Sequence, residues 1–324
     1  MRITLGLLLA VSTLPAQNAN DTAEAHIAAA KAAAGDDFQN LFQFQCNGPG
    51  PGGPRGAPGA GRGQAGGRGP RPQGPPERST WHAEPVKVFD NLYFFGQSEY
   101  SVWAITTSQG IIVLDTIFDY SIEDEVAEGM KKLGLDPANI KYAVVSHAHP
   151  DHDGGARFLQ EHYGTRVIMS PADWDVLDKR TFGTKPKRDI EATDGQKLTL
   201  GGETVTLYIL PGHTPGTISS VFPVKDHGTM HIASLWGGVG LNQEPESVRT
   251  YIRSAQRFSD IVKQAGADII LTNHTDWDRS KINLPLLAKG AAGTPNPYIV
   301  GNAKVLNFLK VAEECATARL GAAN

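Results

Sequence analysis

A cluster of metal-ligand side chains near the middle of the chain constrains the fold more than any other feature. Three histidines and one aspartate lie within six residues, at His147, His149, Asp151 and His152. They directly follow the apolar stretch 142–145, which predicts a buried strand. Because a sharp loop at a strand end can point alternate side chains toward one place, we expect the first two histidines to face one metal ion and the last two residues to face a second. Imidazole and carboxylate ligands favour zinc at such a site.

Two more histidines stand at the ends of later predicted strands. His213 lies in a tight loop, 211–216, after a strand predicted at 204–210, and His274 follows a strand predicted at 268–271. Both share the strand-end position of the first cluster, so a layered fold would bring the three loops to one edge. The other histidines are isolated, and we interpret them as surface or packed residues: His26, His82, His162, His227 and His231.

From Trp81 onward, short strand patterns alternate with amphipathic helix patterns in two successive sets. The first set has predicted strands at 86–89, 92–96, 102–107, 110–115, 142–146 and 166–169, predicted helices at 121–133 and 155–163, and a helix opening at 170–171. The second set has predicted strands at 197–200, 204–210, 217–223, 230–234 and 268–271, and predicted helices at 246–264 and 303–319. Two such sets predict an α/β fold in which two sheets pack face to face with helices outside. We assign residues 81–320 to this domain.

The residues before Trp81 differ in character. Residues 1–16 combine Arg2, an apolar run and a small-residue cleavage site, which predicts an export signal and a periplasmic or secreted protein. A buried N-terminal helix is the alternative. Residues 21–45 predict a helix that opens with a capping-box pattern. Residues 47–78 are dominated by Gly and Pro with scattered Arg, which predicts a flexible tether; the missing aromatic side chains disfavour nucleic-acid binding.

Charge and cysteine content exclude some classes of partner. The formal net charge of −4 is mild and indicates neither a nucleic-acid binder nor a membrane-surface binder. No stretch after the export signal is long and apolar enough to predict a membrane span. The two cysteines, Cys46 and Cys315, are compatible with one disulfide in an exported chain. Two free thiols are the alternative.

The motifs resemble those of the metallo-β-lactamase superfamily. Its His-x-His-x-Asp-His signature stands here at 147–152 and its Gly-His-Thr-Pro-Gly loop at 212–216, and the similarity runs from about Val86 to His274. The resemblance implies the metallo-β-lactamase fold, a four-layer αβ/βα sandwich. It also implies a zinc-dependent hydrolase of a small-molecule substrate with two zinc ions per chain.

Ser234 refines the resemblance. Many superfamily hydrolases have a metal-bridging aspartate at this position and other lactamases have a cysteine, whereas subclass B3 metallo-β-lactamases have neither. Similarity to subclass B3 implies two ligand sets, His147, His149 and His213 for the first zinc, and Asp151, His152 and His274 for the second. It further implies hydrolysis of a β-lactam amide by a metal-bound hydroxide that Asp151 orients.

Two residues are candidates for supporting roles near the metals. Asp115 ends an apolar strand and either fixes a ligand histidine or serves only as a turn residue. Ser234 is a candidate hydrogen-bond partner of a metal-bound water. Because no bridging carboxylate is expected, we predict that the second zinc binds less tightly than the first.

The substrate stays open at this point because the sequence departs from the B3 pattern in two loops. The loops at 235–239 and 275–278 lack the usual Pro-Gly turns, and both border the expected substrate position. The alternatives are a lactone, another amide, or a sulfate or phosphate ester. An iron enzyme would more often have a carboxylate at the position of His149, and a non-catalytic metal-binding relative would usually have lost ligands. The sequence predicts no oligomeric state.

Overall fold

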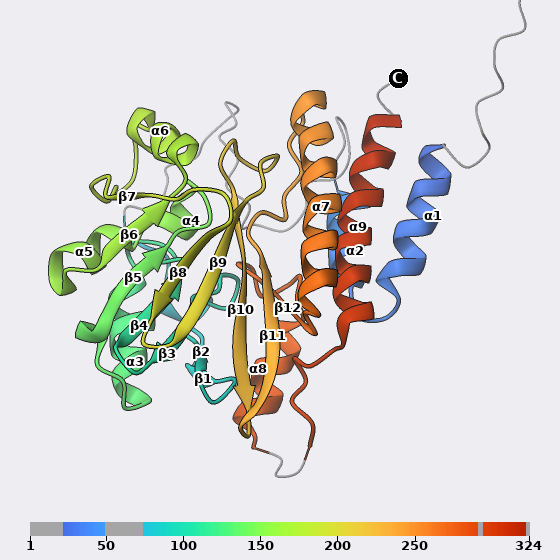
Figure 1. Ribbon diagram of the computed structural model, residues 1–324. Coiled ribbons are helices and arrows are strands. Elements are labelled where there is room, and N and C mark those ends of the chain that lie inside the picture. The colour runs from blue at the N-terminus through green and yellow to red at the C-terminus, as the bar shows by residue number, and fades with distance from the viewer. Residues whose placement is uncertain (1–21, 49–73, 291–293, 322–324) are drawn as a thin grey trace, which may run out of the picture.

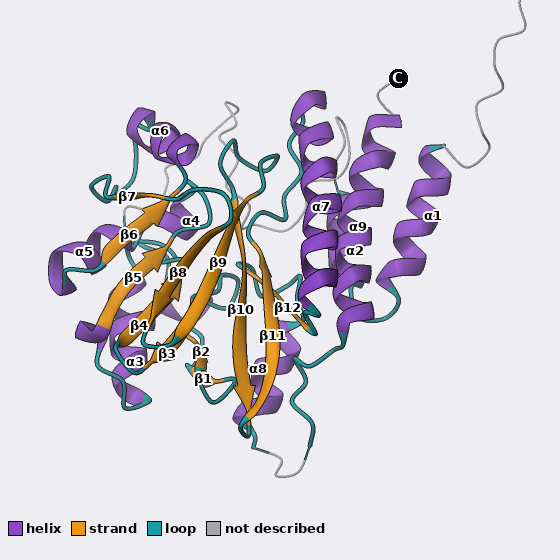
Figure 2. Cartoon of the chain, viewed as in Figure 1, coloured by secondary structure: helices purple, strands orange, loops and turns teal. Residues whose placement is uncertain are grey.

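Two β-sheets packed face to face form the centre of the molecule (Figure 1). The computed structural model describes residues 22–48, 74–290 and 294–321. The predicted export signal at 1–16 and most of the predicted tether at 47–78 lie outside these ranges. Helices cover the outer face of each sheet, as the purple ribbons beside the orange strands show in Figure 2. This helix–sheet–sheet–helix order confirms the predicted four-layer αβ/βα sandwich.

The first sheet follows chain order and changes from antiparallel to parallel in its middle. Its strands are β1 (Val86–Lys87), β2 (Leu92–Phe94), β3 (Trp103–Thr107), β4 (Gly110–Leu114), β5 (Ile140–Val144), β6 (Arg166–Met169) and β7 (Ile190–Glu191). Pairing is antiparallel from β1 to β4 and parallel from β4 to β7. Parallel neighbours need long crossovers, which contain the π-helical turn η2 (Glu123–Ala127), α3 (Glu128–Lys132), η3 (Pro137–Asn139), α4 (Pro150–Asp153), α5 (Ala156–Tyr163) and α6 (Pro171–Lys179).

The second sheet has the order β12-β11-β10-β9-β8. Its strands are β8 (Gln196–Leu200), β9 (Glu203–Ile209), β10 (Ile218–Asp226), β11 (Thr229–Trp236) and β12 (Ile269–Thr272). Helix α7 (Pro245–Ala265) connects β11 to its parallel neighbour β12. Pro245 starts this helix, and Gly266 ends it with a left-handed φ of 65°. Its buried residues recur every three or four positions, so one face of α7 packs on the sheet.

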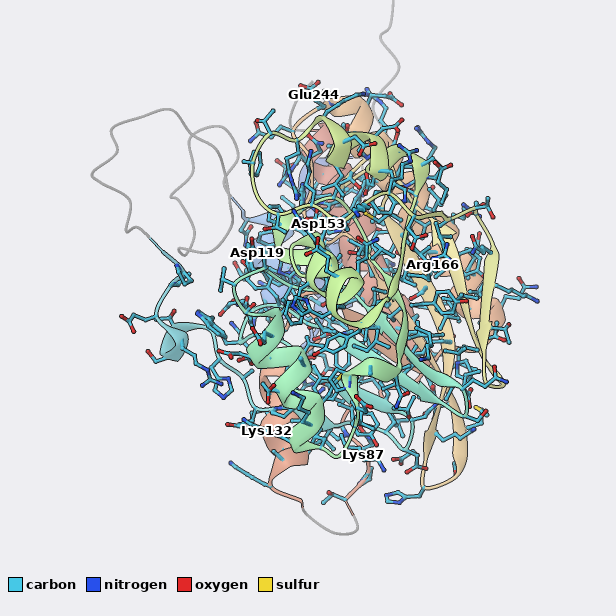
Figure 3. The ribbon with its side chains drawn as sticks, turned by 90° about the vertical axis from the view of Figure 1, so that its left-hand side faces the viewer. Lys87, Asp119, Lys132, Asp153, Arg166 and Glu244 are labelled. Carbon is cyan, nitrogen blue, oxygen red and sulfur yellow. A yellow bond between two sulfur atoms is a disulfide. The ribbon has the colours of Figure 1, made fainter. Side chains whose placement is uncertain are left out.

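Apolar side chains fill the three spaces between the layers. The space between the sheets contains Trp103, Ile112, Phe222 and Leu271, among others. The outer face of the first sheet packs on α3, α5 and α6 through residues such as Met130, Leu159 and Trp174. The outer face of the second sheet packs on α7 and on α9 (Asn302–Gly321) through residues such as Phe258, Phe308 and Ile270. Figure 3 views the molecule from the side of α3, α5 and α6.

The N-terminal segment corrects one prediction, because residues 21–45 do not form a single helix. The structure has α1 (Ala23–Ala34) and α2 (Gln39–Cys46), separated by Gly35, whose φ of 48° and ψ of −143° no helix accommodates. Thr22 caps α1 by accepting a hydrogen bond from the backbone N–H of Ala25. Both helices pack against α9 at the outside of the second sheet (Figure 1).

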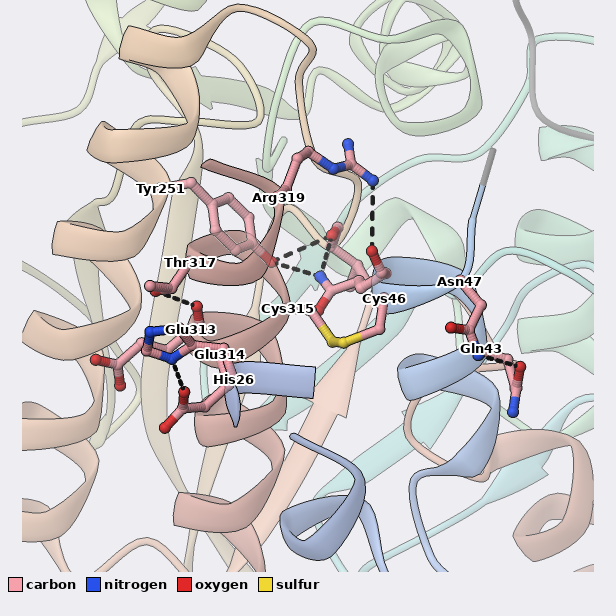
Figure 4. Close-up of a disulfide and its surroundings, with 12 residues drawn as sticks. His26, Gln43, Cys46, Asn47, Tyr251, Glu313, Glu314, Cys315, Thr317 and Arg319 are labelled. Atoms are coloured by element: carbon pink, nitrogen blue, oxygen red, sulfur yellow. Dashed lines mark hydrogen bonds and ion pairs between the residues drawn. A yellow bond between two sulfur atoms is a disulfide. The ribbon is translucent and has the colours of Figure 1, made fainter. Parts of the chain in front are cut away.

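A disulfide joins this helical pair to the C-terminal helix. Cys46 at the end of α2 is bonded to Cys315 in α9, with the two Cα atoms 4.7 Å apart (Figure 4). The bridge spans 269 residues of sequence. It therefore fixes α2 beside the main domain at a point far from it in the sequence.

Some short elements were absent from the sequence prediction. They are η1 (Arg78–Thr80), η3, β7, α4 and α8 (Ser280–Ala288). Pro285 lies inside α8 and weakens its helix signal. The strand predicted at 142–146 is displaced toward the N-terminus, to Ile140–Val144, a shift typical of predicted boundaries. Within the described ranges, every helix is too short or too polar to cross a membrane.

Candidate metal centre

The predicted ligands come together at one edge of the sandwich, where β5, β9 and β12 end. The ligand atoms of His147, His149 and His213 lie within 4.8 Å of one another. Those of a second group, Asp151, His152 and His274, meet the same limit. We call these groups the first triad and the second triad. The centroids of the His147 and His152 rings are 4.3 Å apart, so the two triads share one site.

The first triad has the spacing that zinc requires. Nε2 of His213 lies 3.1 Å from Nε2 of His147. Two nitrogens bound to one tetrahedral zinc at ~2.0–2.1 Å would lie about 3.3 Å apart. His147 is buried, whereas His149 and His213 are partly exposed. The triad is therefore closed to solvent at His147 and open to solvent at His149 and His213.

Hydrogen bonds fix which ring nitrogen of His147 carries the proton. The Ser146 hydroxyl donates to Oδ2 of Asp115 at 2.9 Å and accepts from Nδ2 of Asn273 at 3.0 Å. Since its single proton is used on Asp115, its 3.0 Å contact with Nδ1 of His147 requires the histidine to donate. Nε2 of His147 is then unprotonated and available to a metal ion.

His213 is oriented in the same manner by the loop after β11. Its Nδ1 donates to the carbonyl oxygen of Gly240 at 2.7 Å. A Cβ atom at Gly238 would lie 2.7 Å from Cβ of His213, so this loop packs directly on the ligand. The loop is held by Gln45 of α2, whose amide donates to the carbonyl of Val239 at 2.6 Å. Sequence reasoning missed Gln45, because nothing local connects an N-terminal helix to this loop.

The second triad combines charged and neutral ligands. Oδ2 of Asp151 lies 3.2 Å from Nε2 of His152 and 3.8 Å from Nε2 of His274. On the other side of the His152 ring, Nδ1 lies 2.9 Å from Oδ2 of Asp115. Asp115 thus contacts His152, one of the predicted ligand histidines.

His152 provides a test of whether the site suits a cation. Its side chain is fully buried, and neither ring nitrogen makes a hydrogen bond of good geometry within the described residues, although Nδ1 lies 2.9 Å from Asp115 and Nε2 lies 3.2 Å from Asp151. A buried ring nitrogen without a partner is costly. Because Nε2 faces Asp151 and the other triad members are neutral imidazoles, a zinc ion fits the donor set of both triads.

The protonation states also differ between ligands. The pKa of His149 is lowered to about 3, first by burial and then by the neighbouring His213, and that of His274 is lowered to about 3 by burial and His152. The pKa values of His147 and His213 are lowered too, chiefly by burial. For His152, burial lowers the pKa, but the charges of Asp151 and Asp115 outweigh it and raise the value to about 10.

A buried carboxylate ties two ligand loops together. Asp173, in the first turn of α6, accepts hydrogen bonds from Thr214 Oγ1 at 2.7 Å, from Ala148 N at 3.3 Å and from Gly216 N at 3.2 Å. Ala148 lies between two ligands, and Thr214 directly follows a third. Asp173 therefore sets the separation of the loops that carry the first triad. The Ser170-x-x-Asp173 pattern signalled a helix start, but nothing in it signalled this contact.

Ser234 does not lie at the centre. It lies in β11 on the same face as Ile232 and Trp236, which pack with the outer helices. Its hydroxyl donates to the carbonyl of Ile269 at 2.9 Å. The structure therefore gives Ser234 a role between strands instead of the predicted contact with a metal-bound water.

Comparison with known proteins places these motifs in a family. Residues 96–227 match the model of the metallo-beta-lactamase superfamily. The N-acyl homoserine lactonase AttM of Azorhizobium caulinodans is 26% identical over 192 residues, 52% of this chain and 72% of AttM. A hydroxyacylglutathione hydrolase of Acidiphilium cryptum is 32% identical over 83 residues, 26% of this chain. The chain spans only 31% of that enzyme's length.

Solved structures show the same architecture. BJP-1, a subclass B3 metallo-β-lactamase of Bradyrhizobium japonicum, superposes with a TM-score of 0.61 at 25% identity, covering 71% of this chain and 91% of BJP-1. Native FEZ-1 of Legionella gormanii superposes with a TM-score of 0.62 at 24% identity, covering 70% of this chain and 91% of FEZ-1. The central part of the chain, residues 96–227, therefore matches the metallo-β-lactamase superfamily, and the fold is similar to that of its subclass B3 enzymes.

Proposed function

We propose that this protein is an exported dinuclear zinc hydrolase that opens the amide bond of a β-lactam. The observation that carries the proposal is the composition of the second triad, in which His274 completes Asp151 and His152 while Ser234 lies elsewhere. This is the ligand set that similarity to subclass B3 implies. The likeness to BJP-1 supports the same substrate class.

The residues of the site suit hydrolysis without a serine or cysteine nucleophile. When bound, zinc polarises a carbonyl and lowers the pKa of coordinated water from 15.7 toward ~7. Asp151 stays a carboxylate, because the charge of His152 and its hydrogen bond outweigh the effect of burial and lower the pKa of Asp151. This carboxylate would hold the metal through one oxygen, and its other oxygen would orient the attacking water and take part in the proton transfer to the leaving nitrogen. Asp115 holds the ring of His152 in place during this transfer, and Ser146 holds the ring of His147.

Export is part of the proposal. It is supported by the signal-like composition of residues 1–16 and by the disulfide between Cys46 and Cys315, since disulfides persist in oxidising compartments. Cell fractionation of the full-length chain tests it. Recovery of the protein in the cytoplasm with an intact N-terminus would contradict export.

A substrate panel with metal control tests the activity. We expect the purified protein to hydrolyse a chromogenic cephalosporin, to lose this activity with a chelator and to regain it with zinc, with a metal count of two per chain. Zinc-loaded protein that leaves every β-lactam intact would contradict the proposal. Zinc-ligand variants such as His213→Ala control for a contaminating enzyme.

A second candidate is hydrolysis of a lactone or thioester. It is favoured by the match to AttM, which covers 72% of that lactonase, and by the matches to hydroxyacylglutathione hydrolases. The same panel should contain an N-acyl homoserine lactone and a glutathione thioester. A kcat/KM at least about 100-fold higher on one of these than on any β-lactam would replace the first candidate, since it equals about 2.7 kcal/mol of transition-state preference.

A further inference from the structure

A row of partly exposed aromatic side chains runs beside the second triad. Phe44 stacks on Trp277 with ring centroids 4.4 Å apart and planes 25° apart, and Trp277 lies 6.5 Å from the ring of His274. The Tyr100 ring also lies beside His274, with centroids 5.1 Å apart. The centroid of the Phe118 ring lies 5.2 Å from that of Tyr100, and the centroid of the Tyr120 ring lies 5.1 Å from that of Phe118. We define the aromatic strip as Phe44, Trp277, Tyr100, Phe118 and Tyr120.

The strip is assembled from segments that are distant in the sequence and held rigidly. Phe44 comes from α2, which Gln45 and the disulfide at Cys46 fix in place. The segment before β3 is tied to the loop after β12 by hydrogen bonds from Ser101 N to Asn273 O at 3.0 Å and from Thr275 N to Glu99 O at 3.2 Å. The rings are therefore positioned before any ligand arrives, which reduces the entropy lost on binding.

The exposure of the strip distinguishes it from a core cluster. Phe44 is 36% exposed, and the other four rings are partly exposed. The largest aromatic residues inside the cores, such as Trp103 and Trp174, are fully buried, whereas Trp277 and Tyr100 pack at the margins of two cores and stay partly exposed. Apolar surface left in water beside a reactive centre is typical of a ligand site, because a ligand can bury it.

The charges around the strip indicate the type of group that it accepts. Asp119 lies exposed between Phe118 and Tyr120, and Asp151 stands at the second triad. Lys281 is engaged by Glu99 at 2.6 Å and by Asp276 at 2.9 Å. Away from the metal ions, these side chains therefore disfavour an anionic substituent. The faces of aromatic rings favour apolar and aromatic groups.

We propose that the aromatic strip is a subsite for an uncharged aromatic substituent of the substrate, next to the second triad. The proposal deepens the proposed function, on which it rests, by naming the substrate class as amides or esters that carry such a group. The ring would lie along Trp277 and Tyr100 while the scissile carbonyl faces the two triads. Phe44 would be a specificity-determining residue from outside the matched family region at 96–227.

Binding of metal-directed probes tests the subsite without any turnover. Acetohydroxamate and benzohydroxamate share a zinc-binding group and differ in a methyl or phenyl substituent. We expect zinc-loaded protein to bind benzohydroxamate about tenfold more tightly, as one or two added aromatic contacts would give. Phe44→Ala should reduce this ratio by about threefold, and Trp277→Leu should bring it close to one.

The matched control is Met230→Ala, which removes an exposed apolar side chain at the other end of β11 and should leave the ratio unchanged. A ratio near one in the unmodified protein, no binding of either probe, or equal effects of Phe44→Ala and Met230→Ala would each overturn the proposal. Failure of the hydrolysis panel with the ratio intact would instead count against the proposed function alone.

Discussion

The two triads lie side by side but prepare for a metal ion in different ways. The first triad consists of three imidazoles whose pKa values are all lowered, so its ligand atoms are unprotonated at neutral pH. In the second triad, His152 lies between Asp151 and Asp115, and these charges raise its pKa to about 10 against the effect of burial. A cation entering the first triad therefore displaces no proton, whereas one entering the second must displace a proton from His152. This difference supports the prediction that the second zinc binds less tightly.

The supports of the triads differ too. The first triad is braced by Asp173, by the carbonyl of Gly240 and, through Ser146, by Asp115. In the second triad, Asp115 contacts His152 directly. Ligand identity alone therefore does not define a metal site. The two sites differ in the protonation of their histidines and in the residues that support them, although the sequence motif presents them as equivalent.

Removal of one ligand from each triad should give the largest difference in zinc content and kcat/KM between two variants. We expect His213→Ala to lose its tightly bound zinc and to lower kcat/KM by at least about 1000-fold, since several kcal/mol of charge stabilisation disappear. His274→Ala should keep about one zinc per chain and retain more activity. Metal counting after gel filtration checks both. Equal zinc content in both variants would contradict the proposed difference in zinc affinity between the triads.

The pH dependence of zinc affinity should show the next largest effect. Binding of the second zinc releases the proton of His152, so its apparent affinity should rise about tenfold per pH unit, or about 100-fold from about pH 6 to about pH 8. The first zinc should change much less over this range, because the pKa of His149 is lowered to about 3. Calorimetric titration in buffers of different ionisation enthalpy measures the protons released. Equal proton release in both steps would contradict the assignment.

Substitution of Asp173 or Asp115, the carboxylates that support the ligand histidines, should have a smaller effect on zinc affinity, and a different one for each triad. Asp173→Asn places an amide N–H against the backbone N–H of either Ala148 or Gly216, and we expect about 10–100-fold weaker binding of the first zinc. Asp115→Asn should weaken the second zinc by a similar factor through His152, and the first zinc less, because Asp115 reaches His147 only through Ser146. Competition with a chromophoric chelator measures both. The matched control is Glu125→Gln, a buried carboxylate that contacts His82 and Ala83 and neither triad, so its zinc affinities should stay unchanged.

Loss of the disulfide should have the smallest effect on the metals. The double variant Cys46→Ala, Cys315→Ala removes a bridge across 269 residues and should lower the free energy of unfolding by about 3–5 kcal/mol. Gln45 still binds the carbonyl of Val239 in this variant, so we expect both zinc affinities to stay within about threefold. Thermal unfolding and chelator competition measure the two quantities. A large loss of zinc would show that the disulfide itself positions the first triad.

The sequence alone determined the ligand atoms and the class of fold. The residues from His147 to His152 are adjacent, and their types and their place after an apolar strand carry the chemistry locally. The alternation of strand and helix patterns likewise indicated the layers, since each element buries one apolar face. These features need no knowledge of which distant segments meet.

The tertiary structure decided the support of those ligands. The contact of Asp173 with two ligand loops, the hold of Gln45 on Val239 and the placement of Phe44 on Trp277 each join segments far apart in sequence. The break at Gly35 and the position of Ser234 were also settled only there, by backbone conformation and by strand facing. Local pattern fixes what a side chain can do chemically, whereas its partners depend on how distant segments pack, which no local pattern encodes.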